Sequence, residues 1–528
     1  MGIFDNLKLI PLSNEAGWHK SIERSFLFVS PASMRVAADE LIIELYREVF
    51  FEKRSGDGKY KKLNPEEQET EEKFVFEDSE KYSLYMARGR EFQNNTQNNH
   101  FYTPLYPSLG RSSWPRKQNE RVLQSFFFRA IAQHIQGDGG SNQDLMSNFI
   151  DKFYVAFAGS AEKKEKDIAG LEIDFLNGCI EEREAKDNIG ELCGTSHLSR
   201  VGKKEKKIKS IFTLQGGSDP LAHTIFEDLG HLLALEKHLD RLQWMNLMKT
   251  FLRLSSSVWL MAQMKMTVVL RDELINILSN RYDPKDDAWI DKVVKNRMNG
   301  LFTPTMTPAK HIDGDVKEYV RARIELNILV SLVEKYTQDD WSEKTITLHG
   351  IANTELGILQ LLTKADNIAG ALKKDLDSNK LTLRAALTRH CERYPGWEMK
   401  KNNQPLKGYS EFLRVLRKMD KGDEDGGYLV IPDKQVKTGY RIFPGNLMLK
   451  LITYLANCKK PSNKKLILAD VEKHFSRYGV DFGEKGDMRH KLILSLQEMG
   501  ILKGSPDAGD GVSVSNPFQH KKSSRVKN

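Results

Sequence analysis

The sequence predicts a mainly α protein: a large multi-helical body with minor β elements, followed by a small C-terminal α+β domain. Three observations predict this fold class. Apolar residues recur at helical spacing in several stretches before residue 420. The 528 residues are 40% hydrophobic and 29% charged, which suits a globular protein with a sizeable core. After residue 444, three amphipathic helix patterns precede two short strand patterns.

The helical body occupies the first 420 residues. We assign residues 1–160 to an N-terminal helical region with a long polar and aromatic loop, and residues 161–420 to the main helical body. Helix patterns in these regions have apolar residues every three or four positions, and they cover residues 33–53, 121–136, 144–157, 219–280, 316–336, 354–376 and 381–393.

The most helical part of the sequence runs from Asp219 to Asn280. Asp219 and Pro220 supply an N-cap and a proline at the first helical position. The length of this stretch predicts two or three packed helices rather than one. One apolar stripe is expected on it, formed by Leu242, Met245, Met248 and Leu252.

A polar, glycine-rich break at residues 418–427 is the best candidate for a domain boundary. We assign residues 428–518 to short strands plus a C-terminal domain, and residues 519–528 to a basic tail. Strands are expected at 428–431, 440–443, 501–503 and 512–514, and helices at 446–458, 467–478 and 487–499. Gly479 and Gly500 fit helix-ending glycines, and Asp487 fits an N-cap.

Three helices and a hairpin within about 70 residues resemble a winged helix-turn-helix domain. The resemblance rests on the junction at residues 498–502 and the hairpin after it, and it covers residues 444–518. The rest of the chain resembles no family. The resemblance implies that the third helix reads a DNA groove and that the hairpin is the wing. Winged helices also bind proteins, so a protein-docking role stays open.

Positive charge is concentrated at the C-terminal end. The chain has 80 Lys and Arg against 72 Asp and Glu, and residues 446–528 have 15 against 8. This asymmetry favours a polyanionic partner, most often nucleic acid. The expected DNA-binding residues are basic side chains of the third helix, the wing and the tail: Lys485, Arg489, His490, Lys491, Lys503, Lys521, Lys522 and Arg525. Asp487 and Glu498 on that helix, and Asp507 and Asp510 in the wing, weigh against this assignment.

A second nucleic-acid or partner surface is suggested by an N-terminal stretch that mixes basic and aromatic residues. Guanidinium groups bind phosphate, and aromatic faces stack on unpaired bases. Its basic residues are Arg88, Arg90, Arg111, Arg116, Lys117 and Arg121. The alternative is that the aromatic residues fill the core beneath a long loop.

No pattern in the sequence indicates a specific reaction. A Walker A motif is missing, because Lys204 stands where Ser or Thr is needed. His223, Glu227 and His231 share one helix face, but the two histidines are separated by about 12 Å, too far to bind one metal ion directly. We therefore expect no catalytic residue, no metal and no cofactor.

One acidic cluster offers an enzymatic alternative, a metal-dependent nuclease. His311, Asp313, Asp315 and Glu318 lie close together in the sequence, in a glycine-containing segment ahead of a predicted helix. Helix capping by Asp315 is the other interpretation.

The leading interpretation is a non-enzymatic DNA-binding and scaffold subunit of a prokaryotic multi-protein complex, either DNA-processing or a restriction-like anti-phage defence system. This is an analogy of architecture alone, because no motif names a system. A pure protein–protein interaction subunit is a further alternative. The expected partners are DNA and other protein subunits, with an ATPase as one candidate. Four scattered cysteines and the lack of a long apolar run favour a cytoplasmic protein without membrane contact.

Overall fold

The structure is a computed structural model. It describes Phe4, Leu7, 52–53, 60–61, Lys152, Ala156, 220–279, Met298, 300–304, 311–337, 355–379, 381–392, 426–432, 440–461, 463–483, 486–503 and 512–518. Of these residues, 73% are helical and 6% lie in strands. The prediction of a mainly α protein is therefore confirmed. No helix in these ranges is both long enough and apolar enough to cross a membrane.

One long helix, α13 (Arg241–Leu278), organises the described part of the chain. Its 38 residues extend over about 57 Å at 1.5 Å per residue. Asp240 caps it by accepting a hydrogen bond from the Gln243 backbone N at 2.7 Å. It follows helix α12 (Pro220–Leu235) and the short 3-10 helix η6 (Glu236–His238). The prediction of two or three helices within residues 219–280 is confirmed.

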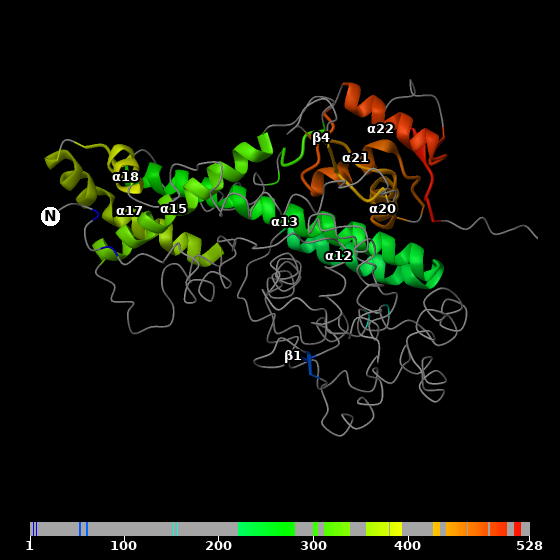
Figure 1. Cartoon of the computed structure of the whole chain (residues 1–528), viewed down its shortest axis with the longest axis horizontal. Coiled ribbons are helices and arrows are strands. Elements are labelled where there is room, and N and C mark those ends of the chain that lie inside the picture. The colour runs from blue at the N-terminus through cyan, green and yellow to red at the C-terminus, as the bar shows by residue number, and fades with distance from the viewer. Residues whose placement is uncertain are drawn as a thin grey trace, which may run out of the picture.

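The two halves of α13 pack into two different apolar clusters. In Figure 1 the helix runs from the orange and red elements at one end to the yellow-green helices at the other. The first half joins α12 and residues 426–518, which we call the C-terminal unit, in the C-terminal cluster. The second half joins α15 (His311–Thr337), α17 (Glu355–Ser378) and α18 (Leu383–Cys391) in the body cluster. Because one continuous helix belongs to both clusters, the clusters share a rigid connection.

The C-terminal unit has the predicted elements. It contains strands β3 (Val430–Pro432) and β4 (Tyr440–Ile442), helices α20 (Asn446–Cys458), α21 (Leu468–Arg477) and α22 (Asp487–Glu498), and strands β5 (Leu502–Lys503) and β6 (Ser513–Val514). The pairs β3–β4 and β5–β6 are antiparallel. Ile467 forms an isolated antiparallel bridge with Ser513, and backbone hydrogen bonds join residues 466 and 468 to residues 514 and 512.

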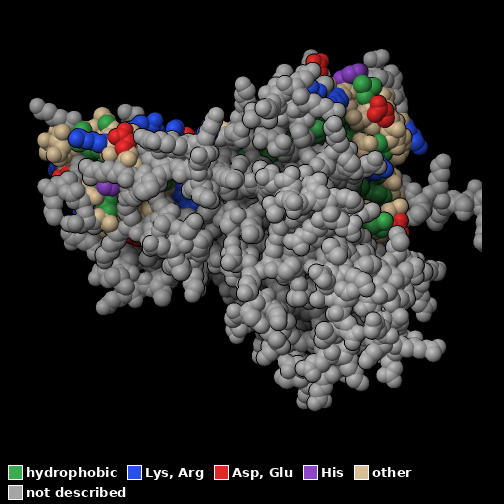
Figure 2. Space-filling view, in the orientation of Figure 1, with side chains coloured by type: hydrophobic (Ala, Val, Ile, Leu, Met, Phe, Trp, Pro, Cys, Tyr) green, Lys and Arg blue, Asp and Glu red, His purple; other side chains and the backbone are tan. Residues whose placement is uncertain are grey.

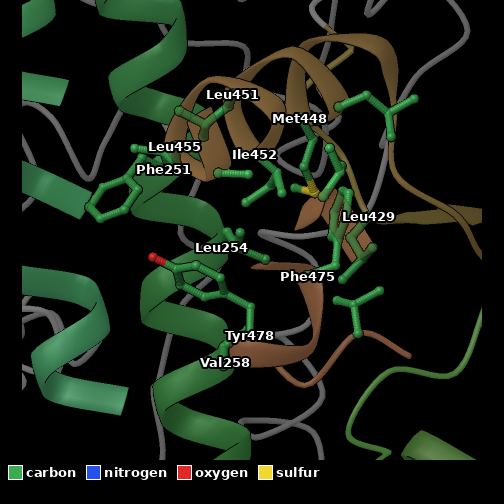
Figure 3. Close-up of a cluster of buried hydrophobic side chains, with 14 of the residues drawn as sticks. Phe251, Leu254, Val258, Leu429, Met448, Leu451, Ile452, Leu455, Phe475 and Tyr478 are labelled. Atoms are coloured by element: carbon green, nitrogen blue, oxygen red, sulfur yellow. The ribbon is translucent and has the colours of Figure 1, made fainter. Parts of the chain in front are cut away.

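The C-terminal unit is docked on α13 through large apolar side chains. Phe251, Leu254 and Val258 of α13 are fully buried in the C-terminal cluster. They lie against side chains of α20 and α21, as Figure 3 shows. Burying a side chain of this size contributes roughly 1.5–3 kcal/mol. This packing places the C-terminal unit in one core with α12 and α13.

Buried charges fix the pairing of α13 with α15. The Arg271 guanidinium donates to Glu325 at 2.6 Å and to Glu318 at 2.7 Å. It also lies 2.9 Å from Asp272. Three carboxylates around one guanidinium satisfy a charge that would otherwise be costly to bury.

Three local predictions are corrected by the structure. Helix α15 begins at His311, so Asp315 lies inside the helix rather than at its N-cap; acids near a helix N-terminus are favoured by the helix dipole. Leu242 is 56% exposed, because the first turn of α13 buries Arg241, Trp244 and Met245 instead. Residues 52–53 form strand β1, which pairs with β2 (Tyr60–Lys61), rather than the end of a helix.

Several predictions lie wholly or mostly outside the described residues. These are the helix at 121–136, the break at 418–427, the tail at 519–528, and the rest of the helix at 33–53. Within the predicted helix at 144–157, the described residues Lys152 and Ala156 are helical.

Candidate nucleic-acid interface

Helix α22 is anchored by the side chains that the sequence assigned to the core. Leu492 and Leu496 are fully buried and Ile493 is 7% exposed. They share the C-terminal cluster with residues of α20 and α21: Leu451, Leu455, Val471 and Phe475. The expected burial of this face is confirmed. The helix begins at Asp487 with Gly486 as its N-cap, so Asp487 lies in the first turn and is not the cap.

Arg489, a predicted DNA contact, is engaged within the protein. Its Nε donates to Oε1 of Glu472 at 2.6 Å, and Nη2 donates to Oε2 at 3.3 Å. Glu472 lies on α21, so this two-pronged contact joins the two helices. The Arg489 side chain is 18% exposed, in contrast to the exposed position expected from the sequence.

Lys491 is also partly withdrawn from solvent. Its ammonium lies 4.4 Å from the centre of the Phe443 ring, a cation–π contact between α22 and the residue after β4. Partial burial lowers the pKa of Lys491, and the nearby Arg441 charge lowers it further. Arg489 and Lys491 therefore both contact other parts of the protein.

The most exposed line of α22 has mixed chemistry. It consists of Asp487, His490, Leu494 and Glu498, at the spacing of one helix face. Leu494 is 41% exposed. Figure 2 shows acidic, histidine and hydrophobic side chains close together over α22. Among the predicted DNA-binding residues on this helix, only His490 is exposed.

Two exposed lysines lie on or next to the sheet beside α22, one in β5 and one ahead of the bridge to β6. Lys503 of β5 is paired with Ser513, which also pairs with Ile467. Because side chains alternate along a strand, Lys503 points to the face opposite the buried Leu502. Lys465 lies two residues ahead of the bridge between Ile467 and Ser513. Lys503 and Lys465 are exposed. The strands at 502–503 and 513–514, and Ile467 bridged to Ser513, contain no acidic residue.

The other predicted contact residues lie outside the described part of the chain. These are Lys485, Lys521, Lys522 and Arg525 of the C-terminal set. They also include the whole second surface: Arg88, Arg90, Arg111, Arg116, Lys117 and Arg121. The DNA-binding assignment of all these residues stays a prediction.

Sequence reasoning missed a buried polar cluster that joins α12 to the C-terminal unit. Asp228 of α12 is fully buried. Its Oδ2 accepts a hydrogen bond from the Tyr478 hydroxyl at 2.8 Å and lies 2.9 Å from Nε2 of His474. Burial raises the pKa of Tyr478 well above 10.0, and the Asp228 charge adds to the shift, so this tyrosine stays protonated as a donor.

Lys459, which follows α20, extends the cluster toward solvent. Its ammonium contacts Glu227 and lies 3.9 Å from Oδ1 of Asp228. Glu227 also lies 3.2 Å from His223. The pKa of Glu227 is raised by burial but lowered more by Lys459 and His223 together, so it lies below 4.5. The i, i+4 pattern of His223 and Glu227 marked this face of α12, but no local pattern marked its partner.

The acidic cluster of the nuclease alternative is partly engaged in structural contacts. Glu318 accepts a hydrogen bond from Arg271. In the ranges that the structure describes, no group of three His, Cys, Asp or Glu side chains is arranged to hold a metal ion. No protein-family model matches the chain, and no curated protein matches it either.

Proposed function

We propose that the C-terminal unit is a winged helix-turn-helix module, and that the protein is a non-enzymatic subunit that binds DNA through it. The observation that carries the proposal is the antiparallel bridge of Ile467 with Ser513, which ties the segment between α20 and α21 to the β5–β6 hairpin. Three helices, this bridged segment and the hairpin thus share one core. This arrangement sets α22 beside an antiparallel hairpin with Lys503 exposed on it and Lys465 exposed in the segment bridged to it, which suits a groove and its flanking phosphates.

The rest of the chain serves as a scaffold in this proposal. Helix α13 connects the C-terminal cluster with the body cluster. DNA bound by the C-terminal unit would therefore be held at a fixed position relative to the surface of the helical body. By analogy of architecture, we place the protein in a prokaryotic DNA-processing or anti-phage defence complex with other subunits, an ATPase among the candidates.

A second candidate function, protein docking through α22, is favoured by the exposed line of that helix. Asp487 and Glu498 repel phosphate, and Leu494 offers an apolar contact. A partner for this face would present basic groups around an apolar side chain.

Filter binding of the full chain to a short duplex across a salt series tests DNA binding. The full chain is needed because the C-terminal unit shares its core with α12 and α13. We expect affinity to fall linearly on a log–log plot as salt rises, since phosphate contacts release counterions. The double variant Lys465→Glu/Lys503→Glu should weaken binding. The variant Lys373→Glu/Lys374→Glu makes the same charge change at exposed positions of α17 and should have little effect.

Two results of this experiment would redirect the proposal. If the folded parent protein fails to bind duplex DNA at low salt, the DNA role is removed and protein docking becomes the leading function. If the protein cuts DNA with magnesium or manganese, and Asp313→Ala with Asp315→Ala abolishes cleavage, the nuclease alternative replaces the non-enzymatic one.

A further inference from the structure

We propose that Glu472 acts as an intramolecular gate on DNA binding, by occupying the guanidinium of Arg489 that would otherwise bind a backbone phosphate. This inference rests on the proposed function and concerns how the same interface is regulated. In the gated state, Arg489 is paired with α21. In the open state, its guanidinium is transferred from a carboxylate to a phosphate.

The geometry of the contact supports competition between the two anions. Two nitrogens of Arg489 face the two oxygens of Glu472, at 2.6 and 3.3 Å. A phosphate takes the same forked geometry on a guanidinium as a carboxylate does. A phosphate therefore has to displace Glu472 from Arg489, and the free energy of this ion pair is subtracted from the affinity for DNA.

The contact is positioned where such an exchange is feasible. The side chains of Arg489 and Glu472 are 18% and 21% exposed, so neither is sealed in the core. Arg489 lies between the exposed residues Asp487 and His490, at the N-terminal end of α22, where a groove-binding helix makes its contacts. An arginine in this position can change partner without unfolding the helix.

Glu472 is itself held in place by the buried cluster on α12. His474 of the same helix and Tyr478, the residue that follows the helix, lie within hydrogen-bond distance of Asp228. Helix α21 is thereby clamped to α12, and the carboxylate of Glu472 is presented to α22 from a fixed backbone. A contact chain thus runs from α12 through α21 to the first turns of α22, and it gives the scaffold a route to influence DNA affinity.

The experiment is a double-mutant cycle on the full chain, with duplex DNA as the probe. The variants are Glu472→Gln, Arg489→Ala and the double variant, with Glu498→Gln as the control. Glu498 is exposed on α22, so its neutralisation removes one negative charge from the unit without touching Arg489. Thermal melts are measured first. If Glu472→Gln melts at a lower temperature than the parent, Glu472→Asp replaces it, because the shorter side chain weakens the paired hydrogen bonds with Arg489.

If the gate exists, Glu472→Gln should bind DNA about tenfold more tightly than the parent, because one charge-assisted pair no longer has to be broken. Its salt slope should stay close to that of the parent, because Arg489 binds a phosphate in both complexes and only the cost of leaving Glu472 differs. Glu498→Gln should give a smaller gain with no change in slope. In the Arg489→Ala background, the gain from Glu472→Gln should shrink to the level of that control.

The failures of the gate and of DNA binding are distinguishable. If the parent binds DNA and Glu472→Gln binds no more tightly than Glu498→Gln, the gate is overturned while the DNA role stands. If the gain from Glu472→Gln persists in the Arg489→Ala background, the effect is one of general charge, and the gate is again overturned. If neither the parent nor any folded variant binds, the proposed function fails and the gate fails with it.

Discussion

Nε2 of His474 lies 2.9 Å from Oδ2 of Asp228, although 246 positions separate the two residues in the sequence. Both side chains are almost completely buried. The pair connects α12 of the helical body with α21 of the C-terminal unit. A buried carboxylate needs donors in a specific arrangement, whereas apolar contacts tolerate sliding. We infer that this pair fixes the orientation in which the C-terminal unit docks.

Replacing Asp228 by Ala should destabilise the docked C-terminal unit. The change leaves the Tyr478 hydroxyl and the His474 ring buried without their shared acceptor, and breaking a buried pair in this way typically costs about 3–5 kcal/mol. Hydrogen exchange should accelerate in α12, α20 and α21 but not in α17 and α18. His223→Ala is the matched change on the exposed side of α12, and it should have almost no effect. Equal exchange in parent and variant would contradict the orienting role of Asp228.

Truncations along α22 should separate buried from exposed leucines. Leu492→Ala and Leu496→Ala remove fully buried side chains, and each should lower the free energy of unfolding by about 2–5 kcal/mol. Leu494→Ala, on the same helix but 41% exposed, should change it by no more than about 0.5 kcal/mol. Urea denaturation, monitored by the signal of a probe attached to α22 rather than by tryptophan fluorescence, gives the free energies of unfolding that check this ranking. A large loss for Leu494→Ala alone would show that another surface covers it.

Two helix-ending glycines should respond differently to alanine. Gly479 and Gly500 both have positive φ, at 69° and 66°. A Cβ at Gly479 would lie 2.8 Å from the Met298 carbonyl O and 2.9 Å from Cβ of Leu301, whereas at Gly500 it would meet nothing within 4 Å. Gly500→Ala should therefore cost only the backbone strain, about 1–2 kcal/mol.

Gly479→Ala should lower the free energy of unfolding by about 1–3 kcal/mol more than Gly500→Ala does, because the added methyl group is crowded. It should also weaken the pairing of Phe302 with Val480, which joins residues 301–302 to the end of α21. Thermal melts of the two variants provide the comparison. Equal melting temperatures would mean that Met298 and Leu301 shift to accommodate the added methyl group at no cost in stability.

The stability contributed by Glu325 should depend on pH. Burial raises the pKa of Glu325 above 4.5, although Arg271 opposes the shift. Because the folded state holds this proton more tightly than the unfolded state, the contribution is complete below pH 4.5 and is lost as pH rises through the folded-state pKa. Glu325→Gln has no titratable group at this position. As pH rises from 4.5 through the folded-state pKa of Glu325, the free energy of unfolding of the parent should therefore fall relative to that of Glu325→Gln. A difference that is flat with pH would show that Arg271 fully offsets the burial.

The sequence by itself determined the local elements of the C-terminal unit. The predicted helix at 446–458 matches α20 at both ends, and α21 and α22 differ by one residue at most at each end. The apolar positions Leu492, Ile493 and Leu496 are buried as expected. This success has a physical reason: helix period, capping and glycine turns are set by residues within a few positions of one another.

Only the tertiary structure decided which partners the polar side chains have. Arg489 looks like a free phosphate-binding residue in the sequence, but α21 places Glu472 beside it. Asp228 carries no local signal, and it became a central residue because α20 and α21 dock against α12. Hydrogen bonds and ion pairs act over a few ångströms in space and between any positions in the chain, whereas periodicity records only which face of a helix is apolar.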